Sequence, residues 1–161
     1  MTTLKLVLFD MDGVIFEGKN FWLELHQRMG TEKQAWQLWQ GLATHDYLRL
    51  SELTARKLWQ GRSAQIFLEM IERRPLVTGI EQVFNFLNQN GIATAIVSSG
   101  PYQLAERAKQ LFSITEIFAN KLDIDGSGCF SGSVEVQVID NDKHEVGKAL
   151  QEKYGGTPDT T

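Results

Sequence analysis

The chain has 161 residues, of which 42% are apolar and 22% are charged, and its formal net charge is −4. A chain of this size is expected to form one hydrophobic core with a small satellite domain, and without a basic stripe it is not expected to bind nucleic acid. The single cysteine, Cys129, excludes an internal disulfide, and no apolar run is long enough for a signal peptide or a membrane span, so we expect a cytoplasmic protein without a membrane partner.

The first predicted element is a strand at residues 6–9. All four residues are apolar, without alternation, which is typical of a strand covered on both faces in a parallel sheet. Asp10, Met11, Asp12 and Gly13 follow directly, so two carboxylates and a turn-forming glycine stand at the end of this strand.

Residues 17–75 are predicted to be mostly helical, because their apolar side chains recur at helical spacing. A crossover between parallel strands needs only about a dozen residues, so we expect an inserted helical cap, or lid. We interpret the tryptophans of this region as lid core rather than as a ligand-binding box. They are all four tryptophans of the chain: Trp22, Trp36, Trp39 and Trp59.

The second half of the chain predicts alternating helices and strands. A helix beginning near Ile80 ends at Asn90 and Gly91, and a second apolar strand at residues 92–97 ends at Ser98, Ser99 and Gly100. The elements expected after it are a helix from Pro101 to Phe112, a short strand at 116–119, a hairpin that turns at 125–128 and includes Val134, Val136 and Val138, and a helix over 143–154.

These elements predict an α/β fold with a Rossmann-like parallel sheet, an inserted helical cap and a β-hairpin. We place the α/β core at residues 1–16 and 76–161, and the cap at residues 17–75.

The polar residues that follow the two strands predict a phosphate site, because parallel sheets bind ligands at the carboxyl ends of their strands. Cleavage of a phosphate monoester needs a nucleophile, neutralised phosphate oxygens and a proton for the leaving oxygen. Asp10 suits the nucleophile, and Asp12 suits the acid and base that moves the proton. Since a carboxylate must approach an anion, a cation is required, and Mg²⁺ held by Asp10 and Asp12 is the expected cofactor.

The remaining candidates bind the phosphate. The Ser98 hydroxyl and the backbone N–H groups of Ser99 and Gly100 are expected to form an anion seat at a helix start, and Lys143 adds a fixed positive charge. Each feature alone has an ordinary explanation, namely a turn, a strand-to-helix loop or a solvated lysine. Their joint pattern favours a phosphatase.

The same motifs resemble the haloacid dehalogenase superfamily, and within it the phosphoserine-phosphatase-like branch. The matching segments are residues 8–14, 95–100 and 117–120, the 125–126 hairpin with 131–132, and 142–143, with a helical cap between the first two. The resemblance implies that Asp10 is the nucleophile, Asp12 the acid and base, Ser98 the phosphate-binding hydroxyl and Lys143 the catalytic lysine. It also implies Mg²⁺ bound by the Asp10 carboxylate and the Asp12 backbone carbonyl, and a small phosphorylated metabolite as substrate.

One family motif has no counterpart here. The family completes its Mg²⁺ site with a Gly-Asp followed by a further Asp after a later strand, and none of Asp140, Asp142 and Asp159 is spaced to substitute. The chain is therefore expected to be a truncated form of a longer enzyme, to pair with another chain, or to be a weakly catalytic relative that binds phosphorylated ligands. We expect weak Mg²⁺ binding and reduced turnover, and an exposed first strand as an edge for self-association or for a partner chain.

The resemblance also bears on the substrate. Phosphoserine phosphatases hold the substrate amine with a glutamate early in the cap; the matching position is Lys19, with Glu17 two residues earlier. A lysine there repels an ammonium group and favours an acidic substrate, so phosphoserine is not expected to be the best one. Arg56 or Lys57 is a loose match to the cap arginine that grips a carboxylate, although a solvated cap face explains these residues as well.

Two other functional classes are alternatives to a phosphatase. A non-catalytic module that binds phosphorylated ligands is favoured only by the missing motif. A receiver-type signalling domain is disfavoured, because receivers phosphorylate an aspartate after a later strand, whereas Asp10 and Asp12 follow the first.

Overall fold

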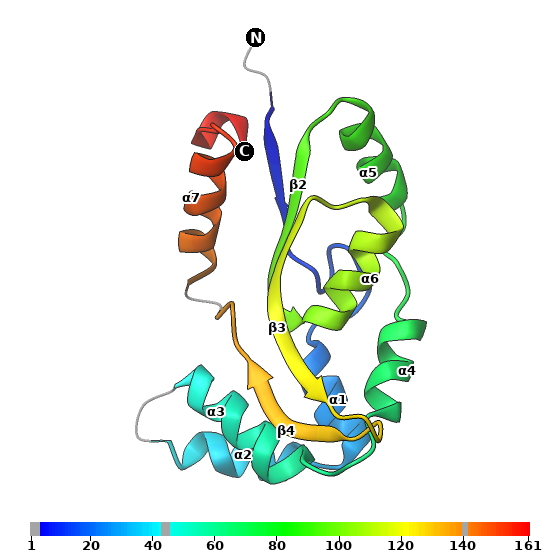
Figure 1. Cartoon of the computed structure of the whole chain (residues 1–161), viewed down its shortest axis with the longest axis vertical. Helices are drawn as coiled ribbons and strands as arrows, with labels where there is room; N and C mark the ends of the chain where they lie inside the picture. Colours follow the sequence, from blue (N-terminus) through cyan, green and yellow to red (C-terminus); the bar gives the residue numbers. More distant parts are fainter. Residues whose placement is uncertain (1–3, 43–45, 140–141) are drawn as a thin grey trace.

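A computed structural model describes residues 4–42, 46–139 and 142–161 of the chain. Its centre is a four-stranded sheet in the order β1-β2-β3-β4, in which β1, β2 and β3 are parallel and β4 is antiparallel to β3 (Figure 1). The bounds are Leu6–Phe9 for β1, Ala93–Pro101 for β2, Glu116–Ile124 for β3 and Phe130–Glu135 for β4. The α/β fold with a parallel sheet is therefore as predicted.

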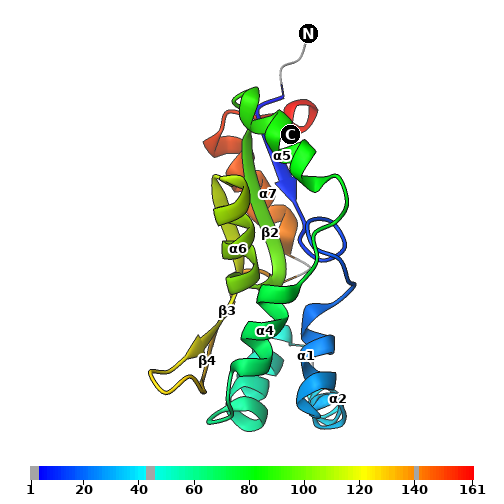
Figure 2. The same ribbon diagram turned by 90° about the vertical axis from the view of Figure 1, so that its right-hand side faces the viewer.

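Helices cover both faces of the parallel part of this sheet, which is why β1 carries apolar residues on both sides. The helix α7 (Lys143–Lys153) lies on one face, and α5 (Ile80–Gln89) and α6 (Tyr102–Phe112) lie on the other (Figures 1 and 2). Successive residues of β1 and β2 alternate between the two layers, since Leu6 and Val97 pack in the cluster beneath α7, whereas Phe9 and Ile96 pack in the larger core.

The helices within residues 21–73, called the lid below, lie at the opposite end of the molecule from both termini (Figure 1). Its helix α1 begins where the Asn20 side chain accepts a hydrogen bond from the Leu23 N–H, and it ends at Gly30 in the left-handed conformation. The interior is aromatic, and the Phe21 and Phe67 rings pack edge to face at 5.8 Å. The lid elements are α1 (Phe21–Met29), α2 (Glu32–Gln40), α3 (Tyr47–Leu53), the π-helix η1 (Thr54–Trp59) and α4 (Gln65–Arg73).

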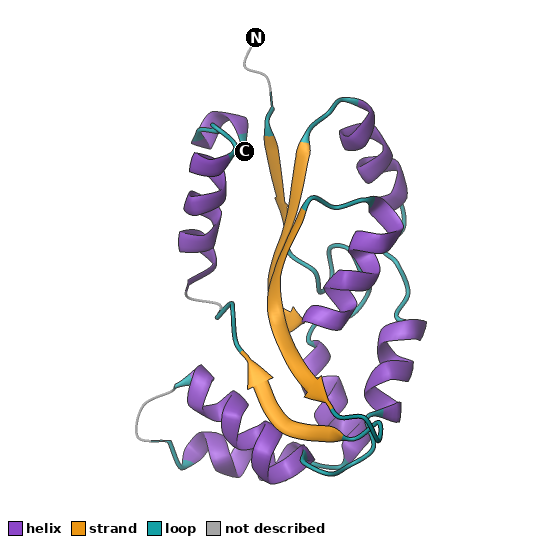
Figure 3. Ribbon diagram, viewed as in Figure 1, coloured by secondary structure: helices purple, strands orange, loops and turns teal. Residues whose placement is uncertain are grey.

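The hairpin differs from the prediction in its first strand. The separate strands expected at 116–119 and around 122–124 form one continuous strand, β3, which runs from the core sheet into the lid (Figure 3). There the hairpin is bonded to the end of η1, because Gly61 N–H donates to the Phe130 carbonyl at 2.8 Å and Ala64 N–H donates to the Gly128 carbonyl at 2.9 Å. The hairpin thus joins the core to the lid.

The second hairpin strand is shorter than predicted. It ends at Glu135, because the backbone N–H groups of Gln137 and Val138 donate to the carboxamide oxygen of Asn120 instead of continuing the ladder. Val138 then packs beneath α7, so Val136 and Val138 do not belong to the hairpin.

The strand β1 is an edge of the described sheet, as predicted. The 3₁₀ turn η3 (Pro158–Thr160) approaches its start, where the Lys5 N–H donates to the Thr160 carbonyl at 3.0 Å. Self-association through this edge stays a prediction. No helix within the described ranges is long and apolar enough to cross a membrane.

Candidate active site

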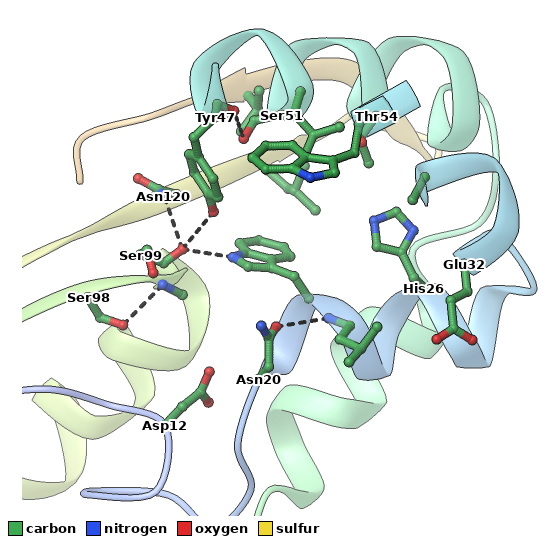
Figure 4. A pocket seen from close by; sticks show the side chains of 18 of the residues that line it. Asp12, Asn20, His26, Glu32, Tyr47, Ser51, Thr54, Ser98, Ser99 and Asn120 are labelled. Atoms are coloured by element: carbon green, nitrogen blue, oxygen red, sulfur yellow. Dashed lines mark hydrogen bonds between the residues drawn. The ribbon is translucent and has the colours of Figure 1, made fainter. Parts of the chain in front are cut away.

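The predicted catalytic and phosphate-binding residues meet in one cavity of about 650 Å³ at the carboxyl ends of β1 and β2. The parallel register pairs Phe9 with Ile96, so Asp10 leaves the sheet beside the last part of β2. Ser98, Ser99 and Gly100 belong to that part of β2, which extends to Pro101 and not only to the predicted residue 97. Figure 4 shows the cavity between this edge of the core and the lid. The lining includes all the predicted catalytic and phosphate-binding residues: Asp10, Asp12, Ser98, Ser99, Gly100 and Lys143.

A tight turn after β1 holds the two aspartates. Met11 between them is fully buried, so the alternation of side chains leaves Asp10 and Asp12 on the opposite side. Gly13 has a φ of 75° and its N–H donates to the Phe16 carbonyl at 2.7 Å. A side chain is strained in this conformation, which explains the glycine.

The Asp10 carboxylate is accessible and faces a lysine. Its Oδ1 lies 3.3 Å from Nζ of Lys143, the first residue of α7, and the two side chains are 46% and 31% exposed. A carboxylate in this setting remains able to reach a ligand in the cavity, and the lysine supplies positive charge beside it.

The Asp12 carboxylate lies in a different environment. Its Oδ2 accepts a hydrogen bond from the Phe21 N–H at 3.0 Å, and its Oδ1 lies 3.7 Å from Nη2 of Arg74. Burial raises the pKa of Asp12 above its ordinary value, assisted by the charges of Asp10 and Glu24, although the Phe21 N–H and Arg74 oppose the shift. A raised pKa is what a carboxyl group needs to carry a proton near neutral pH.

Arg74 is a buried partner of Asp12 that the sequence analysis does not predict, and it lies outside the cavity lining. Its side chain is 6% exposed, forms an ion pair with Glu24 and lies over the Phe21 ring at 5.5 Å. Gly18 makes room for it, because a Cβ at that position would lie 2.0 Å from Nη2 of Arg74. The only signal in the sequence is a charged residue directly before Pro75, where the predicted lid ends.

Ser98 and Gly100 lie in the last part of β2 and differ from the prediction in one contact. The Gly100 N–H, expected to face an anion, donates to Ser98 Oγ at 3.0 Å. The buried Ser98 hydroxyl accepts this bond and keeps its own hydrogen for a ligand. A Cβ on Gly100 would lie 2.5 Å from Cε of Met11 and 3.9 Å from Oδ2 of Asp12, so the glycine keeps this corner of the cavity open.

The Ser99 carbonyl joins the lid to the core. It accepts hydrogen bonds from Trp22 Nε1 at 2.7 Å, Asn120 Nδ2 at 3.0 Å and the Tyr47 hydroxyl at 3.4 Å (Figure 4). Trp22 and Tyr47 belong to the lid, so these bonds hold it against the strand end that carries Ser98.

The predicted substrate residues separate into two groups. Lys19 lines the cavity, whereas Glu17, Arg56 and Lys57 are exposed side chains outside its lining. The structure therefore does not bring Glu17 or Arg56 to the site.

All four tryptophans of the chain line the cavity. Trp59 is 3% exposed, as expected for lid core, but Trp36 is 60% exposed. The interpretation of all of them as lid core is therefore wrong for Trp36, because the apolar stripe of its short helix faces the cavity rather than a packed interior.

The carboxylates of the cavity provide few ligands for Mg²⁺. Within the described residues there is no cluster of three or more His, Cys, Asp or Glu side chains that could hold a metal ion; Asp140 lies outside those residues. Mg²⁺ commonly takes one or two carboxylates and completes its shell with water and phosphate oxygens. The accessible Asp10 carboxylate fits that role, while Oδ2 of Asp12 is already bonded to Phe21. The residues fit a Mg²⁺ ion that depends on the substrate phosphate for further ligands.

Comparisons with known proteins agree with this architecture. The family model of haloacid dehalogenase-like hydrolases matches residues 4–160. Hexitol phosphatase B of Escherichia coli (strain K12) is 23% identical over 135 residues, and the match covers 73% of this chain and 61% of that protein. This chain thus spans about 61% of the length of the curated relative.

Solved structures show the same fold at low sequence identity. A HAD family hydrolase from Salmonella enterica serovar Typhi has a TM-score of 0.78 and 16% identity over 98% of this chain and 54% of that one. A substrate-bound phosphoserine phosphatase has a TM-score of 0.75 and 19% identity over 98% of this chain and 75% of that one. A probable phosphoserine phosphatase from Vibrio cholerae has a TM-score of 0.75 and 22% identity over 97% of this chain and 48% of that one.

Proposed function

Because the chain belongs to the haloacid dehalogenase-like hydrolases, we propose that it forms the site of a Mg²⁺-dependent phosphatase that cleaves a small phosphorylated metabolite through an aspartyl-phosphate. The observation that carries the proposal is the contrast between two carboxylates at one strand end. Asp10 is accessible and paired with Lys143, whereas Asp12 is more buried and has a raised pKa. Two carboxyl groups held in such different environments suit a nucleophile and an acid.

In the first half of the reaction, an Asp10 carboxylate oxygen attacks phosphorus and the bond from phosphorus to the alcohol oxygen breaks. Asp12 gives its proton to the leaving oxygen, so the alcohol departs neutral. Lys143 and the Ser98 hydroxyl hold the phosphate oxygens. Mg²⁺, held by Asp10 and the Asp12 backbone carbonyl, would offset the repulsion between the carboxylate and the phosphate.

In the second half, Asp12 removes a proton from a water molecule that attacks phosphorus. The bond between phosphorus and Asp10 breaks, inorganic phosphate leaves and Asp10 returns to its starting form. Asp12 again carries a proton at the end, ready for the next cycle. The raised pKa of Asp12 supports this alternation, because the protonated form is easier to reach than in an ordinary aspartate.

The division into an α/β core and an inserted lid belongs to the same proposal, with the substrate bound between them. Lys19 lines the cavity, which supports the expectation that phosphoserine, with its ammonium group, is not the best substrate. A weakly catalytic module that binds phosphorylated ligands is the second candidate, favoured by the two-carboxylate donor set of the described residues.

Hydrolysis of phenyl phosphate with and without Mg²⁺ tests the proposal. We expect Mg²⁺-dependent release of phosphate that is slow compared with full-length relatives and is abolished in Asp10→Asn. The matched control is Asp159→Asn, which removes an exposed aspartate outside the cavity. Binding of phosphate without any hydrolysis would favour the second candidate, and equal rates in both variants would contradict the assignment of Asp10.

A further inference from the structure

We propose that the cavity binds a phosphomonoester whose alcohol half carries a planar aromatic ring. This inference rests on the proposed phosphatase function and names the class of substrate. It follows from the shape of the cavity, from the pairing of its polar groups and from an aromatic wall in the lid.

The cavity continues from the phosphate site into the lid. Figure 4 shows Asp12 and Ser98 at one end and His26 and Glu32 at the other. Its volume of about 650 Å³ lies within the range of about 300–1,000 Å³ that is typical of sites for drug-sized ligands. A phosphate held at the Ser98 end therefore places its alcohol half among the lid residues.

Five aromatic side chains contribute to the lid wall of the cavity. The indole of Trp22 stacks with Trp59 at 6.3 Å and interplanar 29°, and it donates its N–H to Ser99, so its ring is fixed in place. Aromatic rings bind other rings through stacked and edge-to-face contacts. The aromatic lining consists of Trp22, Trp36, Trp39, Tyr47 and Trp59.

The polar groups of the lining are largely paired within the protein. The Asn120 carboxamide donates to two carbonyls and accepts from two backbone N–H groups. Ser51 Oγ donates to the Tyr47 carbonyl at 2.8 Å, and Asn20 Oδ1 accepts from the Leu23 N–H. A polyol needs many hydrogen-bonding partners on its surface, and these groups are already engaged, so an apolar ring suits the wall better.

The charges of the lining also favour an uncharged ring. His26 shares a hydrogen bond with Thr31 through Nδ1 at 2.8 Å, and burial lowers its pKa to about 4, so the imidazole is neutral at neutral pH. Among the described lining residues away from the phosphate end, the ionic groups are Lys19 and Glu32, and Glu32 accepts a hydrogen bond from Gln27 at 3.3 Å. Lys19 opposes a cationic alcohol such as choline, although an aromatic cage would otherwise suit a quaternary ammonium group.

Trp36 offers a direct test of this wall. It lines the cavity from α2 and is 60% exposed, so its large apolar surface is available to a ligand. Phe86 on α5 is also 60% exposed but lies outside the cavity lining. The two residues form a matched pair of exposed aromatic side chains on helices.

The experiment uses calorimetric titration of the full chain carrying Asp10→Asn, which prevents turnover. The ligands are 1-naphthyl phosphate, phosphoserine, phosphocholine and a hexitol phosphate. We expect 1-naphthyl phosphate to bind at least about tenfold more tightly than the others, because several ring contacts add to the shared phosphate. Trp36→Ala should weaken the binding of 1-naphthyl phosphate by about tenfold and leave the binding of phosphoserine unchanged. Trp36→Phe should retain most of the affinity for 1-naphthyl phosphate, and Phe86→Ala should retain all of it.

The inference is overturned if another ligand of the panel binds most tightly, if no ligand binds, or if Trp36→Ala and Phe86→Ala behave alike. Circular dichroism of each variant verifies that its fold is retained. If Trp36→Ala does not fold, Trp36→Leu takes its place, because it also removes the ring and should weaken binding of 1-naphthyl phosphate. Hydrolysis by the wild-type chain is measured separately. Hydrolysis without a preference for the aromatic ester rejects the substrate class alone, whereas tight aromatic binding without hydrolysis rejects the phosphatase and leaves the ring site standing.

Discussion

Replacement of Arg74 by methionine removes the positive charge that faces Asp12 while keeping an apolar stem in its place. The guanidinium lies 3.7 Å from Asp12 Oδ1, and the two side chains are 6% and 16% exposed. Glu24, the other ionic partner of Arg74, is 44% exposed. The substitution therefore leaves one nearly buried carboxylate without its cation and one accessible carboxylate in contact with water.

Two independent estimates give the size of the effect at neutral pH. Coulomb's law at 3.7 Å with an effective dielectric constant of about 20 gives an attraction of about 4 kcal/mol. Breaking a buried ion pair by removing one partner typically costs about 3–5 kcal/mol. Asp12 can take up a proton when its cation is removed, as it does in the proposed reaction, so these figures are an upper bound. We expect Arg74→Met to lower the free energy of unfolding by up to about 4 kcal/mol near pH 7.

The loss depends on pH in a definite direction. The folded state holds the proton of Asp12 more tightly than the unfolded chain does, because burial raises the pKa of Asp12 above its ordinary value of 3.8. The stabilising contribution of this group is therefore complete below pH 3.8 and is lost as the pH rises through the folded pKa. Removal of Arg74 takes away a charge that lowers this pKa, so the variant should lose more stability between pH 4 and pH 7 than the wild type does.

Urea unfolding at pH 4 and at pH 7 measures the free energy of unfolding of four proteins: wild type, Arg74→Met, Asp12→Asn and the double variant. The neutral amide of Asp12→Asn needs no cation, so Arg74→Met should cost much less in that background. Glu24→Gln is the control for the second ion pair and should cost no more than about 1 kcal/mol. An equal cost of Arg74→Met in both backgrounds, or a cost that does not change with pH, would refute the idea that Asp12 is a buried charge held by Arg74.

Three further substitutions separate activity from stability. Lys143→Met should lower phosphatase activity by about 100-fold and change the free energy of unfolding by less than about 1 kcal/mol, because Lys143 and Asp10 are both partly exposed. Gly100→Ala should weaken phosphate binding in calorimetry and cost about 1–3 kcal/mol of stability, because its Cβ would lie 2.5 Å from Cε of Met11. Asn120→Leu should cost about 3 kcal/mol or more in urea unfolding, because it removes a buried carboxamide and leaves backbone groups unpaired.

For each of these substitutions, one result would contradict the role assigned to the residue. Unchanged activity in Lys143→Met would remove the lysine from the reaction. Full phosphate affinity in Gly100→Ala would mean that this corner of the cavity does not contact the ligand. Wild-type stability in Asn120→Leu would show that its hydrogen bonds do not hold the strand ends together.

The parts of the fold that the sequence predicts best are those with a simple local pattern. Residues 6–9 form the predicted strand because an uninterrupted apolar run ending in charged residues has few alternatives in a parallel sheet. The meeting of Asp10 and Ser98 is predictable for a related reason, since parallel neighbours end at the same edge.

The features that were missed depend on contacts between distant parts of the chain. The sequence predicts two short strands in place of β3, because Asn120 interrupts the apolar pattern. In the structure this side chain is 1% exposed and forms hydrogen bonds with backbone groups. Arg74 has no local motif, and its role appears only when the lid places it against Asp12. The position of Trp36 was misjudged because helical spacing shows that a helix has an apolar face, not what that face will contact.

The most direct test of the central claim is to identify the phosphorylated residue. Wild-type chain is incubated with phenyl phosphate and Mg²⁺, quenched in acid and analysed by peptide mass spectrometry. The account predicts one phosphoryl group on the peptide that contains Asp10, absent in Asp10→Asn and longer-lived in Asp12→Asn, where the water is no longer deprotonated. Hydrolysis that proceeds in the wild type and in Asp10→Asn alike, with no phosphorylated Asp10 at any time, would contradict it.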